Sequence, residues 1–390
     1  MRVAFYAPLK GPDHPVPSGD RRMARAFRDL LASLGHEVEL ASAFRSHDRA
    51  GDPERQRRLA GLGRRLAARL GDRLGRRPAG ERPGLWFTYH LYHKAPDHLG
   101  PAVSRRLGVP YVVAEASVAR KRAAGPWAEG FAAGLEALAS ADLVLAMTRV
   151  DLEGLARELP AGRLRPFPPF LDTAPFAAAA DDRAGSRARL AQVFGLDPTV
   201  PWLLAVAMMR ADAKLRSYRL LADALGRVTD RGWRLLVAGD GEARAEVEAL
   251  FAPFGARVRF LGALPAGRLP ALYAACDLYV WPAVDEAYGM APLEAQAAGL
   301  PVLAGDEGGV ADVVADGVSG WLVPRRDPAA FAAALASLLD RPEELRRLGA
   351  AALARVPEVH GLAPARARLA AALDDAFANH AGRAASCASA

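Results

Sequence analysis

Residues 277–304, DLYVWPAVDEAYGMAPLEAQAAGLPVLA, read as one complete strand–loop–helix–strand unit. The apolar run 277–281 predicts a strand, 289–298 predicts a helix with Pro292 near its first turn, and 301–304 predicts the next strand. Both apolar runs are short and do not alternate with polar residues. That pattern is typical of strands buried on both faces of a parallel sheet.

The same kind of unit recurs along the chain. Further strands are predicted at 2–7, 37–42, 84–90, 109–115, 142–147, 202–207, 233–238, 257–261 and 320–323. Helices are predicted between them at about 19–34, 55–77, 98–107, 127–140, 216–229, 242–252, 266–275 and 329–339, and a last helix at about 362–379. Strand–helix alternation in two series indicates an α/β fold of two Rossmann-like, doubly wound domains. We expect these domains to face each other across a cleft.

The Pro- and Ala-rich stretch 160–200 interrupts the alternation and sets the expected domain boundaries. We predict a first domain at 1–170, a linker at 171–200, a second domain at 201–355, a C-terminal helix at 356–380 that returns to the first domain, and a flexible tail at 381–390.

The composition is that of an ordinary globular protein. Of the 390 residues, 51% are hydrophobic and 24% charged, which excludes a disordered chain. No apolar stretch reaches the roughly 18 residues of a membrane span, and the N-terminal apolar run is too short for a signal peptide. We therefore expect a cytoplasmic protein. Cys276 and Cys387 form neither a metal-binding spacing nor a disulfide framework.

The net charge of +7 is concentrated in residues 45–82, which hold 12 arginines against five acidic residues. Within this segment, leucines recur every three or four residues from Leu59 to Leu74, with arginines around them. Two interpretations stay open for 55–77: peripheral contact with an anionic membrane at its inner face, or packing of the leucines on their own domain. The segment lacks interleaved aromatic residues, so nucleic-acid binding is not expected.

Chemistry is expected in the loop before the 289–298 helix. Backbone N–H groups at 288–291 lie at the start of that helix, where they suit an anion such as a diphosphate. Two carboxylates, Glu286 and Glu294, flank this site and could accept hydrogen bonds from sugar and ribose hydroxyls, unless Glu286 is a solvated loop residue and Glu294 a surface residue of the helix.

The full string resembles the GT-B retaining glycosyltransferases of family 4, the "group 1" sugar-nucleotide transferases. The matching residues of the family's E-x7-E signature are Glu286, Tyr288, Gly289, Leu293, Glu294, Ala295, Gly299, Pro301 and Val302. The resemblance implies that Glu286 lies at the donor sugar as a catalytic residue and that Glu294 lies at the nucleotide ribose.

The resemblance extends over nearly the whole chain. It implies that Arg210 and Lys214, after the strand at 202–207, contact the donor diphosphate as catalytic cations. The other residues that it places at the donor are Gly19, Gly239, Gly241, Leu264, Tyr288, Gly289 and Met290. Asp312 stands where the family usually has Glu, so its role stays open.

The acceptor is expected at the first domain. Many family members have His after the fourth strand, where this chain has Glu115. Loops that follow parallel strands should open on the cleft, and the acceptor candidates on them are His90, His93, Lys94, Glu115 and Lys121. The neighbouring run Arg120–Arg122 predicts an acceptor that carries phosphate or carboxylate.

The resemblance implies sugar transfer from a nucleotide-diphosphate sugar to a glycan, lipid-linked or small-molecule acceptor. The resemblance implies retention of anomeric configuration. No metal-binding motif occurs, so neither a metal nor a cofactor is expected. The alternatives are an epimerase-type enzyme and a non-catalytic nucleotide-sugar-binding protein of the same fold. A phosphorylase is discounted, because it would need a pyridoxal lysine and the C-terminal half has only Lys214.

Overall fold

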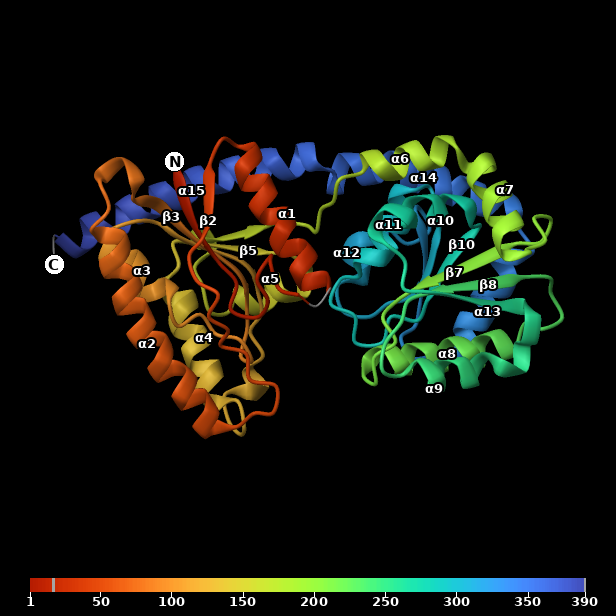
Figure 1. Ribbon diagram of the computed structural model, residues 1–390, viewed down its shortest axis with the longest axis horizontal. Helices are drawn as coiled ribbons and strands as arrows, with labels where there is room; N and C mark the ends of the chain where they lie inside the picture. Colours follow the sequence, from red (N-terminus) through yellow and green to blue (C-terminus); the bar gives the residue numbers. More distant parts are fainter. Residues whose placement is uncertain (16–17, 389–390) are drawn as a thin grey trace. The chain divides into compact units, whose positions relative to one another are not determined.

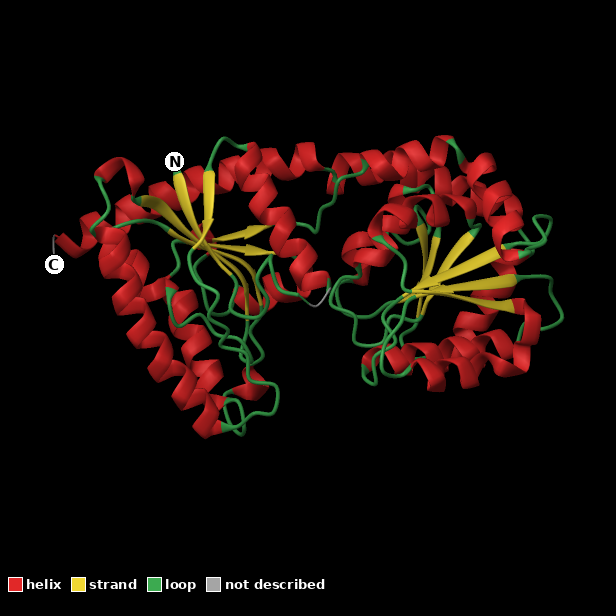
Figure 2. Ribbon diagram, in the orientation of Figure 1, coloured by secondary structure: helices red, strands yellow, loops and turns green. Residues whose placement is uncertain are grey.

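The computed structural model describes residues 1–15 and 18–388, without the side chains of 387 and 388. The chain forms two compact units, Met1–Pro168 with Ala363–Ala390, and Pro169–Leu362. In each unit, helices lie on both sides of one parallel sheet (Figures 1 and 2).

The sheet of the first unit has the strand order β2-β1-β3-β4-β5-β6, and every pairing is parallel. The carboxyl ends of its strands therefore share one edge. The strands are β1 (Arg2–Tyr6), β2 (Glu37–Leu40), β3 (Pro83–Leu91), β4 (Tyr111–Ala116), β5 (Leu143–Ala146) and β6 (Leu164–Pro166). The helices are α1 (Gly19–Ser33), α2 (Pro53–Gly75), α3 (Gly100–Leu107), α4 (Ala128–Ser140), α5 (Arg149–Leu155) and α15 (Leu362–Ala388).

The second unit repeats this plan with the order β12-β11-β10-β7-β8-β9, again parallel throughout. Its strands are β7 (Trp202–Val206), β8 (Arg234–Ala238), β9 (Val258–Gly262), β10 (Leu278–Trp281), β11 (Val302–Gly305) and β12 (Gly320–Val323). Its helices are α6 (Ala174–Asp181), α7 (Arg183–Phe194), α8 (Ala213–Gly226), α9 (Arg244–Phe251), α10 (Leu269–Ala275), α11 (Met290–Ala297), α12 (Val310–Val313), α13 (Pro328–Leu339) and α14 (Pro342–His360).

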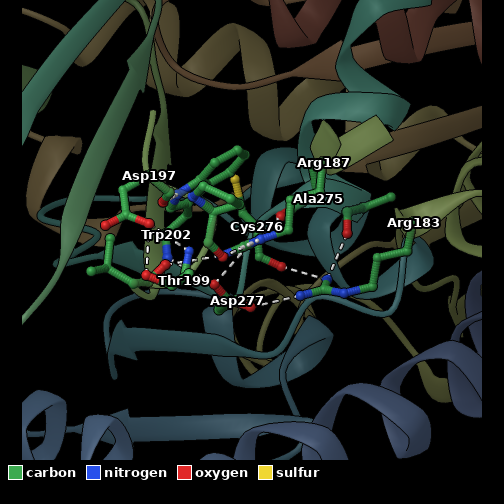
Figure 3. Close-up of polar contacts among 11 residues, drawn as sticks. Arg183, Arg187, Asp197, Thr199, Trp202, Ala275, Cys276 and Asp277 are labelled. Atoms are coloured by element: carbon green, nitrogen blue, oxygen red, sulfur yellow. Dashed lines mark hydrogen bonds and ion pairs between the residues drawn. The ribbon is translucent and has the colours of Figure 1, made fainter. Parts of the chain in front are cut away.

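Residues 171–200, expected as a linker, fold as α6 and α7 within the second unit. Arg183 and Arg187 of α7 donate to the two carboxylate oxygens of Asp277 at 2.7 and 2.9 Å. Asp277 also accepts from the backbone N–H of Trp202 at 2.7 Å, so one carboxylate joins α7 to β7 (Figure 3). The periodicity of this Ala- and Arg-rich stretch is weak, and its helices are fixed by these tertiary bonds.

The C-terminal helix is longer than predicted. It runs to Ala388, so the expected flexible tail is helical as far as the described residues reach. On the first unit, Arg165 pairs with Asp375 of this helix at 2.9 Å, and Asn379 donates to the Asp142 carbonyl at 3.0 Å. These bonds place α15 beside the starts of β5 and β6.

The leucine stripe of α2 packs largely on its own unit. Leu70 and Leu74 are buried, Leu66 is partly buried against the same core, and only Leu62 is well exposed, at 38%. Most arginines of this helix are exposed, among them Arg58, Arg65, Arg69 and Arg73. Among the described residues, no helix is both long and apolar enough to cross a membrane.

Candidate active site

The loop between β10 and α11 is held in an unusual backbone conformation. Ala283 and Asp285 have φ values of 60° and 51°, in the left-handed region that L-residues rarely adopt. Gly289, with φ 77°, is the N-cap of α11, and no side chain caps that helix. Strain of this kind persists only where surrounding structure imposes it, and it often marks functional loops.

Glycines of the following segment form the support for this loop. A Cβ on Gly308 would lie 2.0 Å from the Glu286 carbonyl oxygen, and one on Gly305 would lie 2.3 Å from that of Pro282. The Gly309 N–H donates to the Ala287 carbonyl at 2.6 Å. Only glycine permits this backbone approach, so the segment fixes the position of Glu286.

The Glu286 carboxylate meets Lys214 of α8. Glu286 Oε2 accepts hydrogen bonds from Lys214 Nζ and, at 3.2 Å, from Trp281 Nε1 at the end of β10. The ammonium also lies 5.6 Å from the centroid of the Trp281 ring. Lys214 and Glu286 are both largely buried, with 26% and 16% of their side chains exposed. The site thus combines the Lys214 ammonium, the Glu286 carboxylate and the indole ring of Trp281.

The carboxylate of Asp285 forms ion pairs with arginines from two other segments of the second unit. Its carboxylate pairs with Arg216 of α8 and, at 2.6 Å, with Arg326 after β12. Arg326 also pairs with Glu307 at 3.2 Å and has a positive φ of 60°. These exposed pairs join α8, the loop and the turn after β12.

Glu294 lies inside the second unit, with 2% of its surface exposed. Its Oε2 accepts a hydrogen bond from the Tyr273 hydroxyl of α10 at 3.1 Å. A carboxylate is rarely buried without a specific partner or function. Glu294 is therefore not an ordinary surface residue of α11.

Arg210 lies in the loop after β7, and this loop packs against the loop after β8. A Cβ on Gly239 would lie 1.9 Å from the Ala207 carbonyl oxygen, and one on Gly241 would lie 2.3 Å from that of Met209. Met209 N–H also donates to the Asp240 carbonyl at 2.9 Å. The two glycines are thus required by the packing of one loop on the other, and their contact with a nucleotide stays a prediction.

A second polar cluster lies at the strand ends of the first unit. His90 and Glu115, with φ values of 63° and 58°, lie on β3 and β4 between the paired positions Tyr89–Ala114 and Leu91–Ala116. His90 Nδ1 is 3.3 Å from a carboxylate oxygen of Glu115 and 3.3 Å from one of Asp20 on α1.

The charges in this cluster shift its pKa values. Burial alone would lower the pKa of His90, but the carboxylates of Glu115 and Asp20 outweigh it and raise that pKa to about 9. Although burial acts against it, the bond to His90 and that residue's charge, with Lys10, lower the pKa of Asp20 to about 2. Burial raises the pKa of Glu115. Near neutral pH, His90 is thus a cation beside Asp20.

His93 and Lys94 belong to a different environment. Lys94 Nζ and the Arg122 guanidinium lie 4.8 and 4.7 Å from the centroid of the Trp127 ring, and His93 contacts the same ring edge-on at 5.9 Å. Burial, followed by the charges of Arg122, Lys94 and Lys121, lowers the pKa of His93 to about 4.

Comparison with known proteins defines the family. The sequence model described as "Glycosyl transferases group 1" matches residues 204–355. A D-inositol 3-phosphate glycosyltransferase from Frankia alni is 34% identical over 302 residues, which are 72% of this chain and 72% of that protein. The chain belongs to the group 1 glycosyl transferases.

Other relatives agree with this glycosyltransferase family. The D-inositol 3-phosphate glycosyltransferase of Streptomyces avermitilis is 33% identical over 303 residues, 73% of this chain but only 64% of the relative's length. Two solved structures share the GT-B fold over nearly the full chain. Sucrose-phosphate synthase from Thermosynechococcus elongatus has a TM-score of 0.74 at 21% identity, covering 97% of this chain and 99% of that one. Anabaena HepE in complex with UDP has a TM-score of 0.73 at 18% identity, covering 96% and 100%.

The structure brings some of the predicted residues together and separates others. Glu286 and Lys214 are in contact, and Tyr288, Gly289 and Met290 lie at the adjoining helix start. The five acceptor candidates fall into two groups, because Glu115 lies with His90 whereas Lys94 and Lys121 lie near His93. Gly19 begins α1 on the first unit, and a Cβ there would meet nothing within 4 Å.

Sequence reasoning missed several partners. Trp281 and Tyr273 lie outside the signature, yet they donate hydrogen bonds to its two carboxylates, Glu286 and Glu294. Asp20, directly after the predicted Gly19, was also missed. Its position in the first turn of a helix beside a strand end could have pointed to it.

Leu264 and Met290 are partly buried against the hydrophobic core of the second unit. Asp312 lies in the single turn of α12, where its N–H donates to the Gly309 carbonyl at 3.0 Å. Across the described part of the chain, no three His, Cys, Asp or Glu side chains form a group suited to a metal ion. Metal-independent transfer stays a prediction.

Proposed function

We propose that this protein transfers a sugar from a nucleotide-diphosphate sugar to a hydroxylated acceptor, with retention of anomeric configuration. The observation that carries this proposal is the contact of Lys214 with Glu286 beside Trp281 and the start of α11. The cation and the helix N-terminus suit a diphosphate. The carboxylate and the aromatic ring beside them suit the sugar that the diphosphate carries.

In this reaction the bond between the anomeric carbon and the diphosphate oxygen breaks, and the electron pair leaves with the nucleoside diphosphate. The acceptor oxygen forms the new bond to the anomeric carbon, and its proton is released with the diphosphate. Lys214, Arg210 and the N–H groups at the start of α11 stabilise the charge that develops on the phosphates. Glu286 holds the sugar hydroxyls, and Glu294 holds the ribose.

We infer that the nucleotide is UDP. HepE, which shares the fold, has been solved with UDP and with UDP-glucose. The family assignment and the E-x7-E carboxylates favour an active enzyme over the non-catalytic or epimerase-type alternative.

The test is calorimetric binding of UDP, with GDP and ADP as controls, followed by transfer assays. Lys214→Ala should weaken UDP binding and reduce kcat/KM by about 10²–10³-fold, as loss of one partner for developing negative charge does. A chelator should change neither result. Equal UDP affinity in wild type and Lys214→Ala would place the donor site elsewhere.

A further inference from the structure

A recess of about 400 Å³ lies on the first unit between α2, α4 and the segment after β3. This volume is within the range of about 300–1,000 Å³ that is usual for small-molecule sites. Its polar and charged lining residues all belong to the first unit, and none is part of the donor site of the second unit. They are Ser46, Gln56, Arg64, His93, Lys94, Asp97, His98, Glu129 and Glu136.

Gln56, which lines the recess, is fixed by three hydrogen bonds. Gln56, 6% exposed, donates to Asp48 at 2.9 Å and to the Pro126 carbonyl at 2.7 Å, and it accepts from the Gly130 N–H at 2.9 Å. A Cβ on Gly130 would lie 2.1 Å from the His93 carbonyl oxygen. Glycine is therefore required where α4 meets the loop, and the recess is preformed.

His93 supplies the observation that points to a ligand. Both of its ring nitrogens are buried, and neither has a hydrogen-bond partner among the described residues. The ring lines the recess. With a pKa near 4 the imidazole is neutral at physiological pH, so it offers one donor and one acceptor. A buried polar group left without a partner costs about 1–3 kcal/mol, which a bound hydroxyl group would recover.

The charges of the recess favour a neutral ligand. Arg64 and Lys94 are balanced by Glu129 and Glu136, and Glu129 already pairs with Arg57 at 3.2 Å. The third carboxylate of the lining, Asp97, is buried and already accepts four hydrogen bonds within the first unit. An anionic ligand would face the carboxylates, and a cationic ligand would face the two basic groups. A polyhydroxylated ligand satisfies both, since each hydroxyl donates to a carboxylate and accepts from a cation.

The rest of the lining suits the apolar face of a sugar ring. Leu59, Pro96, Pro101 and Ala133 contribute carbon surface beside the polar groups. We propose that this recess binds a neutral saccharide unit, and that this unit is part of the acceptor. The second half of the proposal rests on the proposed function.

A row of rings joins the recess to the strand ends. The ring centroids of His90 and Tyr92 are 5.0 Å apart, those of Tyr92 and His93 are 5.3 Å apart, and His93 contacts Trp127. An acceptor chain seated in the recess could therefore continue over these rings toward Glu115. The sequence predicts an anionic acceptor from the basic run Arg120–Arg122, whereas the recess favours a neutral one. Two cations of that run already have partners, because Arg120 pairs with Glu158 at 2.7 Å and Arg122 stacks on Trp127.

Saturation-transfer NMR on the full chain can test binding, with methyl α-glucoside, methyl α-mannoside, methyl β-galactoside, maltose and cellobiose at millimolar concentration. We expect at least one of these saccharides to bind. His93→Ala removes the buried imidazole and Ala133→Leu fills the recess from α4, so each should weaken binding at least tenfold. Lys214→Ala, at the donor site, is the matched control and should leave saccharide binding unchanged.

Circular dichroism of each variant would establish that it folds. No saccharide signal from wild type, or signals that survive both recess variants, would overturn the site. For the acceptor half, both variants should raise the KM of the bound saccharide in transfer from UDP-glucose without changing the donor KM. Binding without transfer would overturn the acceptor assignment alone. Failure of the proposed function would appear separately, as UDP binding that is insensitive to Lys214→Ala.

Discussion

Lys214 and Glu286, 72 residues apart in the chain, form an ion pair beside the indole of Trp281. The two residues proposed for the donor diphosphate and the donor sugar thus carry opposite charges that neutralise each other. Under the proposed function, a donor diphosphate would compete with Glu286 for the ammonium, and this competition would couple phosphate binding to release of the carboxylate toward the sugar.

This pairing predicts opposite effects of Glu286→Gln on binding and on catalysis. The isosteric amide leaves Lys214 without its anionic partner, so free UDP should bind about three- to tenfold more tightly, the equivalent of about 0.7–1.4 kcal/mol. The kcat of transfer should fall, because the carboxylate no longer orients the sugar. Calorimetry with UDP and steady-state kinetics measure the two effects, and weaker UDP binding in Glu286→Gln would contradict the competition.

Glu294→Gln should act mainly on donor affinity. Its carboxylate is buried and fixed by Tyr273, and a ribose contact is nearly the same in the ground state and the transition state. We expect the donor KM to rise roughly 10- to 150-fold with little change in kcat, because loss of one charged hydrogen bond costs about 1.5–3 kcal/mol. Tyr273→Phe, which removes only the hydroxyl, is the matched control and should give a smaller rise. A fall in kcat at unchanged KM would assign Glu294 to the chemical step instead.

Gly308→Ala should disable the site without unfolding the protein. The new methyl group would lie 2.0 Å from the Glu286 carbonyl oxygen, so the strained loop must move. A displacement of about 1 Å at a reacting group can reduce the rate about 10²-fold.

Gly317→Ala is the matched control for that loss. Gly308 and Gly317 have φ values of 57° and 70°, so each substitution carries a left-handed penalty of about 1–2 kcal/mol. A Cβ at Gly317 would meet nothing within 4 Å. Thermal unfolding should show that both variants are destabilised, Gly308→Ala more than Gly317→Ala because of the added contact with the Glu286 carbonyl. Kinetics should show a loss for Gly308→Ala alone. Equal activities would mean that the loop does not depend on this support.

The positions of most strands follow from signals that are local in the sequence, and so do most strand bounds. The strand order within each sheet does not, because it depends on pairing between distant segments. The strand missed is β6, only three residues long and ending at Pro166 in a proline-rich stretch. Helices α6 and α7 were missed because long-range bonds, such as those of Arg187 to Asp277, fix them.

The signature residues of the second unit could be placed from their spacing around one helix. The division of the acceptor candidates into two groups could not be predicted from the sequence. His90 and Glu115 adopt left-handed backbone conformations that no β-strand pattern predicts. Tyr92 and Ala95 then form an antiparallel bridge, and the two residues between them, His93 and Lys94, line the recess.

The outer face of α2 predicts a salt-sensitive contact with anionic membranes. Arg58, Arg65, Arg69 and Arg73 are exposed, whereas Leu70 and Leu74 are buried and cannot insert into lipid. Binding should therefore be electrostatic, at about 1 kcal/mol per basic residue near the surface. Flotation with phosphatidylserine vesicles should recover the protein at low salt but not at high salt, and Arg65→Glu with Arg69→Glu should abolish recovery. No flotation of wild type at either salt concentration would exclude the contact.

His90 and His93, three positions apart, should titrate at opposite ends of the pH range. The pKa of His90 is raised to about 9, above its ordinary value of 6.5, so its protonated form stabilises the folded state. That stabilisation is fully present below pH 6.5 and is lost as the pH rises toward 9. Relative to His90→Gln, wild type should therefore lose up to about 3 kcal/mol of unfolding free energy between pH 6.5 and 9, at 1.36 kcal/mol per pKa unit.

The matched control is His93→Gln. The pKa of His93 is lowered to about 4, so its imidazole is neutral throughout this window and the difference from wild type should stay constant. Denaturant unfolding of the three proteins at several pH values measures these differences, and imidazole NMR resolves the two titrations directly. A constant difference between wild type and His90→Gln from pH 6.5 to 9, with an NMR midpoint for His90 near 6.5, would show that Asp20 and Glu115 do not hold its proton.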